Sequence, residues 1–310
     1  MSGPLAGTAS LGVRGLVSGP RRRGRVIVAL PAAAYVEIRA PGPEPCILAL
    51  VTPAAVALPM AVIAGRPAGQ DGERNCRGQQ ARAGESSCLA GLAAGDCAVV
   101  GGGVIEAGRI RVRVRRWWDP VPVLAPLSRS RLQVGYAALQ ALRAASTRRP
   151  GLDEHAGRAA PAALAACCAT GDAPGAAEAV RRLLGLGPGL TPSGDDMVAG
   201  LMLALRLLGA AMAEAMALWL ADRLAAMVTR HARDRTTPVS AALLHCAARG
   251  QGSPEVAGVL RALGGLEPAP AAVARLLAVG HTSGADLAWG LSAGCQAVLA
   301  LPPGDRHESG

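Results

Sequence analysis

The run over residues 193–209 constrains the fold of this chain most, because it is apolar on nearly every side of a helix. Arg206 is its only charged residue beyond the first helical turn. A helix without a polar face is typical of the buried centre of a domain. The sequence therefore predicts a helical domain built around this segment.

A loop rich in glycine, proline, hydroxyls and carboxylates comes directly before and into this helix. It reads Gly185-Leu186-Gly187-Pro188-Gly189-Leu190-Thr191-Pro192-Ser193-Gly194-Asp195-Asp196. Thr191 before Pro192 is typical of an N-cap followed by proline, and Ser193 with Asp196 is a competing, capping-box-like start. Either start leaves N–H groups free below a glycine-rich loop, which favours binding of phosphate or carboxylate. A well-capped helix without a ligand is the simpler alternative. The loop matches neither a Walker A motif nor a dinucleotide fingerprint.

A partial copy of this motif lies nearer the C-terminus. Residues 193–201 and 283–291 share the pattern S-G-x-D-x-x-x-G-L, and each copy opens an apolar helix. Gly200 and Gly290 stand inside these helices, where glycine costs about 1 kcal/mol relative to alanine. We expect the two helices to cross closely at these glycines, so that residues 191–196 face residues 282–286 across a common pocket. Chance similarity between two helix caps is the alternative.

Two further polar sites are candidates. Thr237 before Pro238 repeats the cap-plus-proline pattern. Arg235, just upstream, has the fork geometry to hold a phosphate or carboxylate, or it is a surface charge at a helix C-terminus. His281 is a candidate acid–base group or an ordinary loop histidine.

The rest of the chain predicts an α+β fold, in which an N-terminal, mainly antiparallel β domain is followed by a larger all-helical C-terminal domain. Residues 1–22 are expected to be poorly ordered, 23–122 to form the β-rich domain, 123–303 the helical domain and 304–310 a tail. Residues 65–84 are polar and glycine-bearing, which favours a mobile loop. In 109–115, arginine alternates with aliphatic residues, which predicts a strand with one arginine face.

Individual elements follow from the local patterns. Strands are predicted over 25–30, 34–39, 46–51, 56–63, 97–100, 104–107 and 109–115. Helices are predicted over 128–147, 159–169, 173–184, 193–209, 211–232, 238–249, 254–263, 270–279 and 283–299.

Composition excludes several classes of protein. The net charge is +10, but the arginines are scattered and aromatic residues are only 2%, which argues against nucleic-acid binding. The uncharged run over 46–65 is interrupted by Pro53 and Pro59, so it favours strands over a membrane helix. Eight cysteines without a CxxC pair or a secretory signal indicate reduced thiols in a cytoplasmic protein.

Three segments, GLGPGLTPSGDDMVAGL, RTTPVSAALLHCAARG and GHTSGADLAWGL, together resemble a bacterial family that includes AllH, a subunit of oxamate carbamoyltransferase. The resemblance extends over nearly the whole chain, more weakly in its N-terminal half. It implies a role in allantoin and purine breakdown, together with AllF-like (FdrA-like) and AllG-like partner subunits. The implied reaction joins carbamoyl phosphate and oxamate to give oxalurate and phosphate.

Carbamoyl transfer requires hydrogen-bond donors for the phosphate and for the carbonyl oxyanion. We expect the small anionic substrate to contact Gly187, Gly189, Thr191, Ser193, Gly194, Arg235, Thr236, Thr237, Thr282, Ser283 and Gly284, with the N–H groups of Gly194 and Gly284 among the donors. The candidate catalytic residues are Asp195, Asp196, Asp286 and His281. The three aspartates would also hold Mg²⁺ if the reaction uses it. A non-catalytic assembly or metabolite-sensing subunit is the alternative function.

Overall fold

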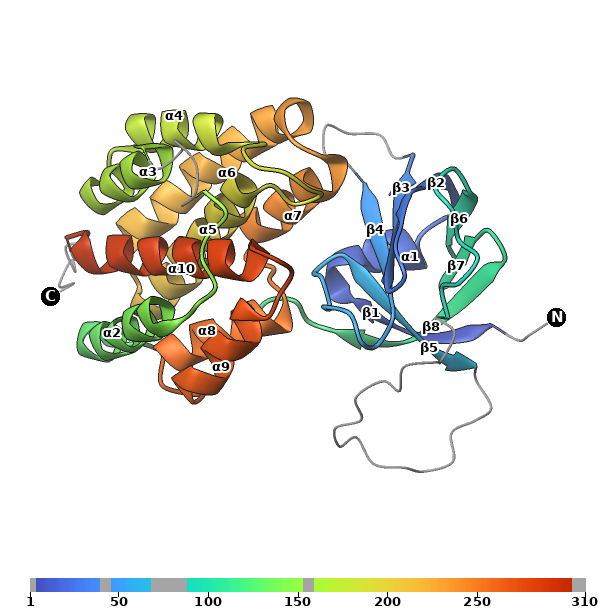
Figure 1. Cartoon of the computed structure of the whole chain (residues 1–310), viewed down its shortest axis with the longest axis horizontal. Helices are drawn as coiled ribbons and strands as arrows, with labels where there is room; N and C mark the ends of the chain where they lie inside the picture. Colours follow the sequence, from blue (N-terminus) through green and yellow to red (C-terminus); the bar gives the residue numbers. More distant parts are fainter. Residues whose placement is uncertain (1–3, 40–45, 68–87, 153–158, 303–310) are drawn as a thin grey trace, which may run out of the picture. The chain divides into compact units, whose positions relative to one another are not determined.

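The computed structural model describes residues 4–39, 46–67, 88–152 and 159–302. The chain divides into two compact units, Met1–Pro120 and Val121–Gly310. The first unit contains the strands and the second contains the long helices (Figure 1). The boundary between the two units lies between Pro120 and Val121, close to the boundary predicted between residues 122 and 123. The predicted tail over 304–310 and most of the predicted loop over 65–84 lie outside the described residues.

The described residues of the first unit form eight strands in a closed barrel. The order around the barrel is β1-β5-β4-β3-β2-β6-β7-β8, and β8 pairs with β1. A 3-10 helix, η1 (Leu11–Val13), and the short helix α1 (Arg14–Ser18) follow the first strand. The strands are β1 (Leu5–Ser10), β2 (Arg22–Ala29), β3 (Ala33–Ile38), β4 (Ile47–Val51), β5 (Ala61–Pro67), β6 (Cys97–Gly101), β7 (Val104–Ala107) and β8 (Ile110–Trp118).

The barrel corrects the predicted fold class of the N-terminal part. The strands close on themselves into a barrel, where a mainly antiparallel β domain without closure was predicted, and two pairings, β1 with β8 and β4 with β5, are parallel. Closure depends on β1, which lies in the segment over 1–22 that was predicted to be poorly ordered. That prediction is wrong for Leu5–Ser10, because this strand pairs with both β5 and β8 and buries Ala9 and Ser10. Its sequence LAGTAS has little strand preference of its own, so pairing with its neighbours determines its structure.

The arginine face predicted on the last strand is present. In β8, Val112 is fully buried, whereas Arg111, Arg113 and Arg115 are exposed. Arg111 contacts Glu106 of β7 at 3.3 Å. An antiparallel β7–β8 hairpin therefore has one face in the barrel core and one basic face outside.

Nine helices make up the described part of the second unit, and each corresponds to a predicted helix. They are α2 (Arg129–Ala145), α3 (Ala159–Thr170), α4 (Ala173–Leu183), α5 (Ser193–Met212), α6 (Ala215–Arg235), α7 (Pro238–Ala248), α8 (Pro254–Leu263), α9 (Ala269–Leu277) and α10 (Ser283–Ala300). The largest error in a boundary is at the start of α6. Helix α5 continues past Gly209 until Ala213 adopts a left-handed conformation with φ of 58°, so α6 begins at Ala215 instead of residue 211.

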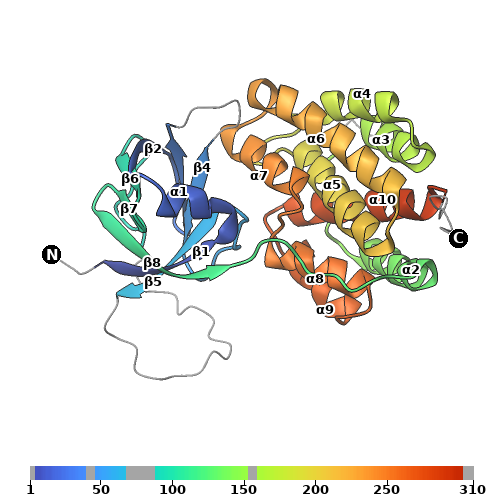
Figure 2. The ribbon, with the colours of Figure 1, turned by 180° about the vertical axis from the view of Figure 1, so that it is seen from behind.

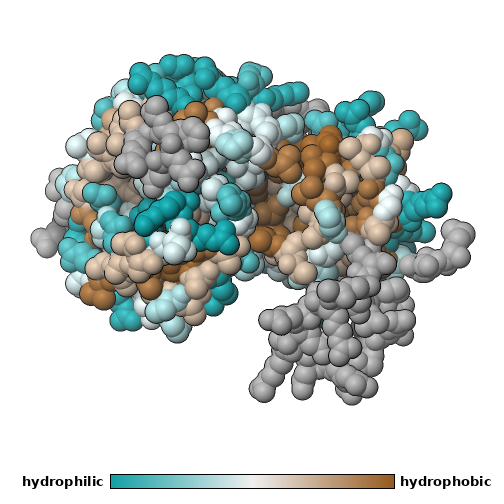
Figure 3. All heavy atoms as spheres, viewed as in Figure 1, coloured by the Kyte–Doolittle hydropathy of each residue, from teal (hydrophilic) through white to brown (hydrophobic). Residues whose placement is uncertain are grey.

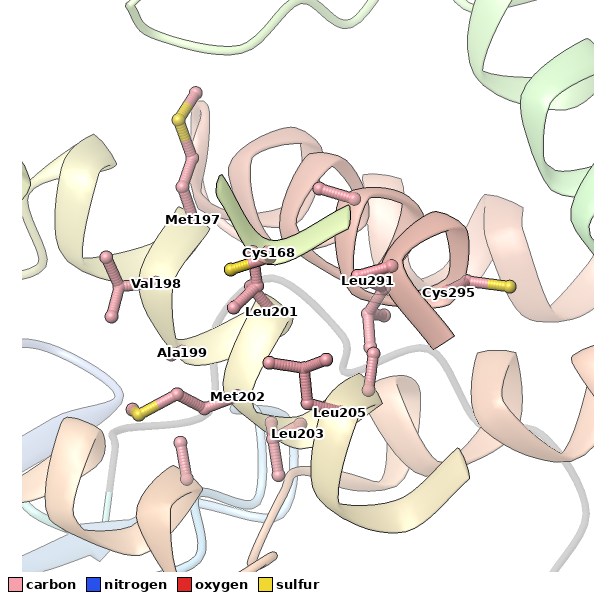
Figure 4. Close-up of a cluster of buried hydrophobic side chains, with 14 of the residues drawn as sticks. Cys168, Met197, Val198, Ala199, Leu201, Met202, Leu203, Leu205, Leu291 and Cys295 are labelled. Atoms are coloured by element: carbon pink, nitrogen blue, oxygen red, sulfur yellow. The ribbon is translucent and has the colours of Figure 1, made fainter. Parts of the chain in front are cut away.

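Helix α5 forms the centre of this unit, as its apolar sequence predicts. Nearly all of its residues are buried. It packs against α10, α6 and α7, and the view from behind shows α7 beside α5 and α6 (Figures 1 and 2). Leu201 and Leu205 of α5 share a buried cluster with Leu291 of α10 and Cys168 of α3 (Figure 4).

The surface carries both polar and apolar regions. On the visible face of the helical unit, hydrophilic residues are interspersed with apolar ones, whereas apolar residues gather on part of the barrel (Figure 3). None of the described helices has the length and hydropathy that a membrane span requires.

Candidate functional site

Helices α5 and α10 cross at the two internal glycines of the repeated motif. A Cβ atom added to Gly290 would lie 2.1 Å from the carbonyl oxygen of Met197, and one added to Gly200 would lie 2.4 Å from that of Leu287. Real Cβ atoms do not approach backbone oxygens this closely, so any larger residue would force the helices apart. The predicted close crossing is confirmed.

The other glycine of each copy, Gly194 or Gly284, makes a second close approach. A Cβ atom on Gly194 would lie 2.2 Å from the carbonyl oxygen of Leu183, and one on Gly284 would lie 2.0 Å from that of Leu276. Leu183 and Leu276 belong to the last turns of α4 and α9, the helices that precede α5 and α10. In both copies, glycine thus lets the start of one helix pack on the end of the previous helix.

The backbone amides of Gly194 and Gly284 both donate hydrogen bonds within the protein. The N–H of Gly194 donates to the carbonyl oxygen of Leu186 at 2.9 Å, and the N–H of Gly284 donates to that of Val279 at 3.0 Å. Both amides are therefore used inside the protein. An anion bound by these amides, as the sequence predicts, would have to displace these hydrogen bonds.

The start of α5 differs from the predicted capped start. The helix begins at Ser193, and Pro192 occupies the N-cap position without a side-chain cap. The hydroxyl of Thr191 instead lies 3.0 Å from the hydroxyl of Ser283. Thr191 therefore joins the first copy of the motif to the second, and residues 92 positions apart in the sequence form one site.

A buried pair of carboxyl groups lies where the two copies meet. Asp196 is 6% exposed and Asp286 is fully buried. The hydroxyls of Ser283 and Thr191 hydrogen-bond to Asp196, and the negative charge of Asp286 raises the pKa of Asp196. Oδ1 of Asp286 accepts a hydrogen bond of 2.9 Å from the N–H of Gly151. Asp196, Asp286, Thr191 and Ser283 are hereafter called the carboxyl–hydroxyl cluster.

Burial raises the pKa of Asp196 to about 8. The nearby charges of Asp286 and Asp195 raise the pKa further, while hydrogen bonds from Ser283 and Thr191 oppose the shift. Asp196 is therefore mainly protonated at neutral pH, so its carboxyl group can donate a hydrogen bond and exchange a proton near physiological pH.

We expect Asp196→Asn to become more stable relative to the wild type as the pH rises. The raised pKa means that the folded chain holds this proton more tightly than the unfolded chain, whose aspartates titrate near pH ~3.9. The stabilisation from protonated Asp196 is complete below about pH 4 and is lost as the pH rises to about 8. The difference in unfolding free energy should therefore grow by up to roughly 1 kcal/mol per pH unit in this range.

Urea unfolding at a series of pH values measures this difference. Asp222→Asn is the control, because Asp222 is 68% exposed and forms only a surface ion pair with Arg206. A difference between Asp196→Asn and the wild type that stays flat from pH 4 to 8, like that of the control, contradicts the raised pKa.

Asp195, the neighbour of Asp196, serves to hold the loop. Its Oδ1 accepts from the N–H of Gly185 at 2.8 Å, and its Oδ2 accepts from the hydroxyls of Thr236 and of Ser240, the latter at 2.6 Å. Burial raises the pKa of Asp195, and these hydrogen bonds oppose the shift. Both carboxyl oxygens are thus committed to the α4–α5 loop and the α6–α7 junction.

The glycine-rich loop needs its glycines for their backbone conformations. Gly185, Gly187 and Gly189 have φ of 78°, 114° and 96°, which residues with side chains rarely adopt. A Cβ atom on Gly185 would also lie 2.0 Å from the carbonyl oxygen of Arg235. Thr237 caps α7 as predicted, and its hydroxyl donates to the carbonyl oxygen of Leu190 in the loop at 2.5 Å. The loop is therefore held against the junction between α6 and α7.

Arg235 and His281 were predicted to belong to the site, but their described contacts are with other residues. The guanidinium of Arg235, at the end of α6, donates to the carbonyl oxygen of Arg181 at 3.3 Å. His281 is exposed, and its backbone carbonyl oxygen accepts from Arg148 at 3.1 Å. The described contacts of both residues are thus made outside the carboxyl–hydroxyl cluster.

Gly151 also belongs to the site, although no sequence pattern pointed to it. Besides its hydrogen bond to Asp286, it lies so close to both copies of the motif that an added Cβ atom would be 2.2 Å from Oγ of Ser193 and 3.2 Å from Oγ1 of Thr282. The only signal in the sequence is the dipeptide Pro150-Gly151, which marks a turn but not its neighbours.

The predicted magnesium ligands do not form a three-carboxylate group. Among the described residues, no cluster of three or more His, Cys, Asp or Glu side chains has the geometry to hold a metal ion. Both oxygens of Asp195 already accept hydrogen bonds from protein donors. The set Asp195, Asp196 and Asp286 therefore does not fit Mg²⁺, and we derive no step through this ion.

Residues 183–295 match the family model described as oxamate carbamoyltransferase subunit AllH. This segment runs from the last residue of α4 into α10, so it contains both copies of the motif but neither the barrel nor α2. The match is narrower than the expected resemblance over nearly the whole chain. No solved structure was found to match the chain.

Residues 183–295 are thus similar to a family of enzyme subunits, whose name implies partner subunits for the proteins that bear it. The likeness to the AllH family rests on this segment of the helical unit.

Proposed function

We propose that this chain is a subunit of an oxamate carbamoyltransferase-like enzyme in allantoin or purine nitrogen breakdown, and that its anionic substrate binds next to the carboxyl–hydroxyl cluster. The family match supports this proposal most directly, because the matched segment contributes all four residues of the cluster. The partners would be AllF-like (FdrA-like) and AllG-like subunits.

The proposed reaction requires a proton to move as one bond forms and another breaks. The amide nitrogen of oxamate attacks the carbonyl carbon of carbamoyl phosphate, the carbon–oxygen bond to phosphate breaks, and the nitrogen loses a proton. Asp196, with a pKa of about 8, is suited to exchange that proton. The hydroxyls of Thr191 and Ser283, with Ser193 and Thr282 beside them, are the proposed donors to the carbonyl oxyanion, which would replace Asp196 as the acceptor of the first two.

Reconstitution of the complex tests the function. We expect phosphate-dependent cleavage of oxalurate when this chain is combined with the AllF-like and AllG-like subunits. Omitting this chain should lower the rate at least about 100-fold, because the proton-transfer group would be missing. The measurement is release of oxamate and carbamoyl phosphate, with each subunit omitted in turn as a control. Full activity of the two partner subunits without this chain would contradict the proposal.

A non-catalytic assembly or metabolite-sensing subunit is the second candidate. It is favoured by the internal hydrogen bonds of the Gly194 and Gly284 amides, which leave these helix starts serving the packing of the fold. This role predicts that the complex requires the chain but tolerates isosteric replacement of its buried carboxyl groups.

A further inference from the structure

A cavity of about 320 Å³ lies beside the start of α10. Ala285 and Trp289 of α10 contribute to its wall, together with residues at and beyond the end of α2. Its volume is that of a site for a small metabolite. Three arginines, Arg143, Arg148 and Arg149, line this cavity, and none of the described lining residues is acidic.

Two of these arginines are held in place by hydrogen bonds. The side chain of Arg148 donates to the carbonyl oxygen of His281 at 3.1 Å, and its backbone N–H donates to the hydroxyl of Ser146 at 3.0 Å. The side chain of Arg143 donates to Oε1 of Gln140 at 3.2 Å. Each of these two guanidinium groups thus has an acceptor within the helical unit.

The third arginine of the cavity wall is Arg149. Arg149 is exposed and, within the part of the chain that the structure describes, has no hydrogen bond or ion pair. Guanidinium groups form paired, charge-assisted hydrogen bonds with carboxylates and phosphates. The ring of Trp289 adds a flat apolar wall. A planar or tetrahedral anion of small size suits this combination.

The cavity adjoins the carboxyl–hydroxyl cluster. Ala285 in its wall directly precedes Asp286, and Gly151, whose N–H donates to Asp286, follows Arg149 by two residues. The chain segments that line the cavity therefore continue directly into residues that contact the cluster, although none of the four cluster residues lines the cavity itself.

The geometry points to this cavity as the binding site for the carboxylate or phosphate group of a small substrate, with Arg148 and Arg149 as its principal ligands. The inference rests on the proposed function for the identity of the substrate, but the binding of an oxoanion is independent of it. It assigns the anion to side chains after α2 instead of to the amides of Gly194 and Gly284.

Calorimetric titration of the purified full chain with inorganic phosphate and, separately, with oxamate tests the inference. We expect at least one of the two to bind, and Arg148→Gln with Arg149→Gln to weaken binding at least about 30-fold, because charge-assisted hydrogen bonds are lost. Arg230→Gln with Arg233→Gln is the matched control. These residues are exposed on α6, outside the cavity wall, and their replacement removes the same charge. The control should change binding by no more than about twofold.

Tryptophan fluorescence gives a second readout of where the anion binds. Binding in the cavity should alter the emission of Trp289, and Trp289→Phe should retain binding while losing that change. A response to phosphate alone assigns a phosphate subsite, and a response to oxamate alone assigns a carboxylate subsite.

The outcomes separate this inference from the proposed function. Absence of binding of both anions up to about 10 mM overturns the inference, since affinity that weak is not that of a built site. Equal binding by the cavity variant and the control also overturns it, even if the reconstituted complex cleaves oxalurate. Arginine-dependent binding by the chain together with an inactive complex leaves the cavity as an anion site and overturns the function.

Discussion

Gly290→Ala is expected to lower the unfolding free energy of the helical unit by at least about 3 kcal/mol. Alanine normally stabilises a helix interior by about 1 kcal/mol relative to glycine. Here the added methyl group would lie 2.1 Å from the carbonyl oxygen of Met197 and 2.8 Å from the backbone nitrogen of Leu201. Both are backbone atoms of α5, so relief requires the two central helices to separate and lose packing along their crossing.

Gly258→Ala provides the matched control within the same unit. Gly258 lies inside α8, and the atoms nearest to its added Cβ are the ends of the Arg275 and Glu267 side chains, at 3.1 and 3.2 Å. Flexible side chains can move, so we expect this variant to be neutral or slightly more stable. Urea unfolding followed by far-ultraviolet circular dichroism compares the two. Equal stability of Gly290→Ala and Gly258→Ala contradicts a crossing in backbone contact.

Asp195→Ala is the second change with a large expected effect, a loss of about 3–5 kcal/mol of unfolding free energy. The substitution removes the acceptor of three hydrogen bonds. The donor groups of Gly185, Thr236 and Ser240, which are buried or half-buried, then lose their partner. It also disconnects the glycine-rich loop from the junction between α6 and α7. The variant should therefore be less stable, and the conformation of its glycine-rich loop should change as well.

Asp222→Ala is the control for removing an aspartate. Asp222 is 68% exposed, and its ion pair with Arg206 lies at the surface, so the loss should stay below about 1 kcal/mol. Thermal unfolding of both variants at pH 7 measures the difference. A loss for Asp195→Ala no larger than that of the control would show that the three hydrogen bonds do not hold the loop.

The sequence predicted the helical unit well because its local signals agree with its packing. Thr237 before Pro238 marks the start of α7 where the structure has it, and glycines inside two apolar helices predicted their crossing. The cap at Thr191 was wrong because the hydroxyl of this residue bonds to Ser283, a partner that no local pattern reveals. The N-terminal capping of α5, which contributes Asp196 to the site, is thus determined by tertiary contacts.

The barrel was predicted less well because its closure depends on distant pairing. Most of its strands have local patterns, but β1 consists largely of small residues and is ordered by its pairing with β5 and β8. In the site, the meeting of the two motif copies was predicted, whereas the contacts of Gly151 and the arginines after α2 were not. Those residues lie in a turn without periodicity, so only the fold brings them to α10.

The measurement that tests the central claim most directly is the rate of phosphate-dependent oxalurate cleavage by the reconstituted complex carrying Asp196→Asn, Asp286→Asn or both. Both residues lie in the carboxyl–hydroxyl cluster, so we expect each single variant to lower kcat about 100-fold and the double variant to be little worse than either. Asp222→Asn in the same complex should retain the full rate. Unchanged kcat in the double variant, with the complex intact, contradicts a proton-transfer site where the two motif copies meet.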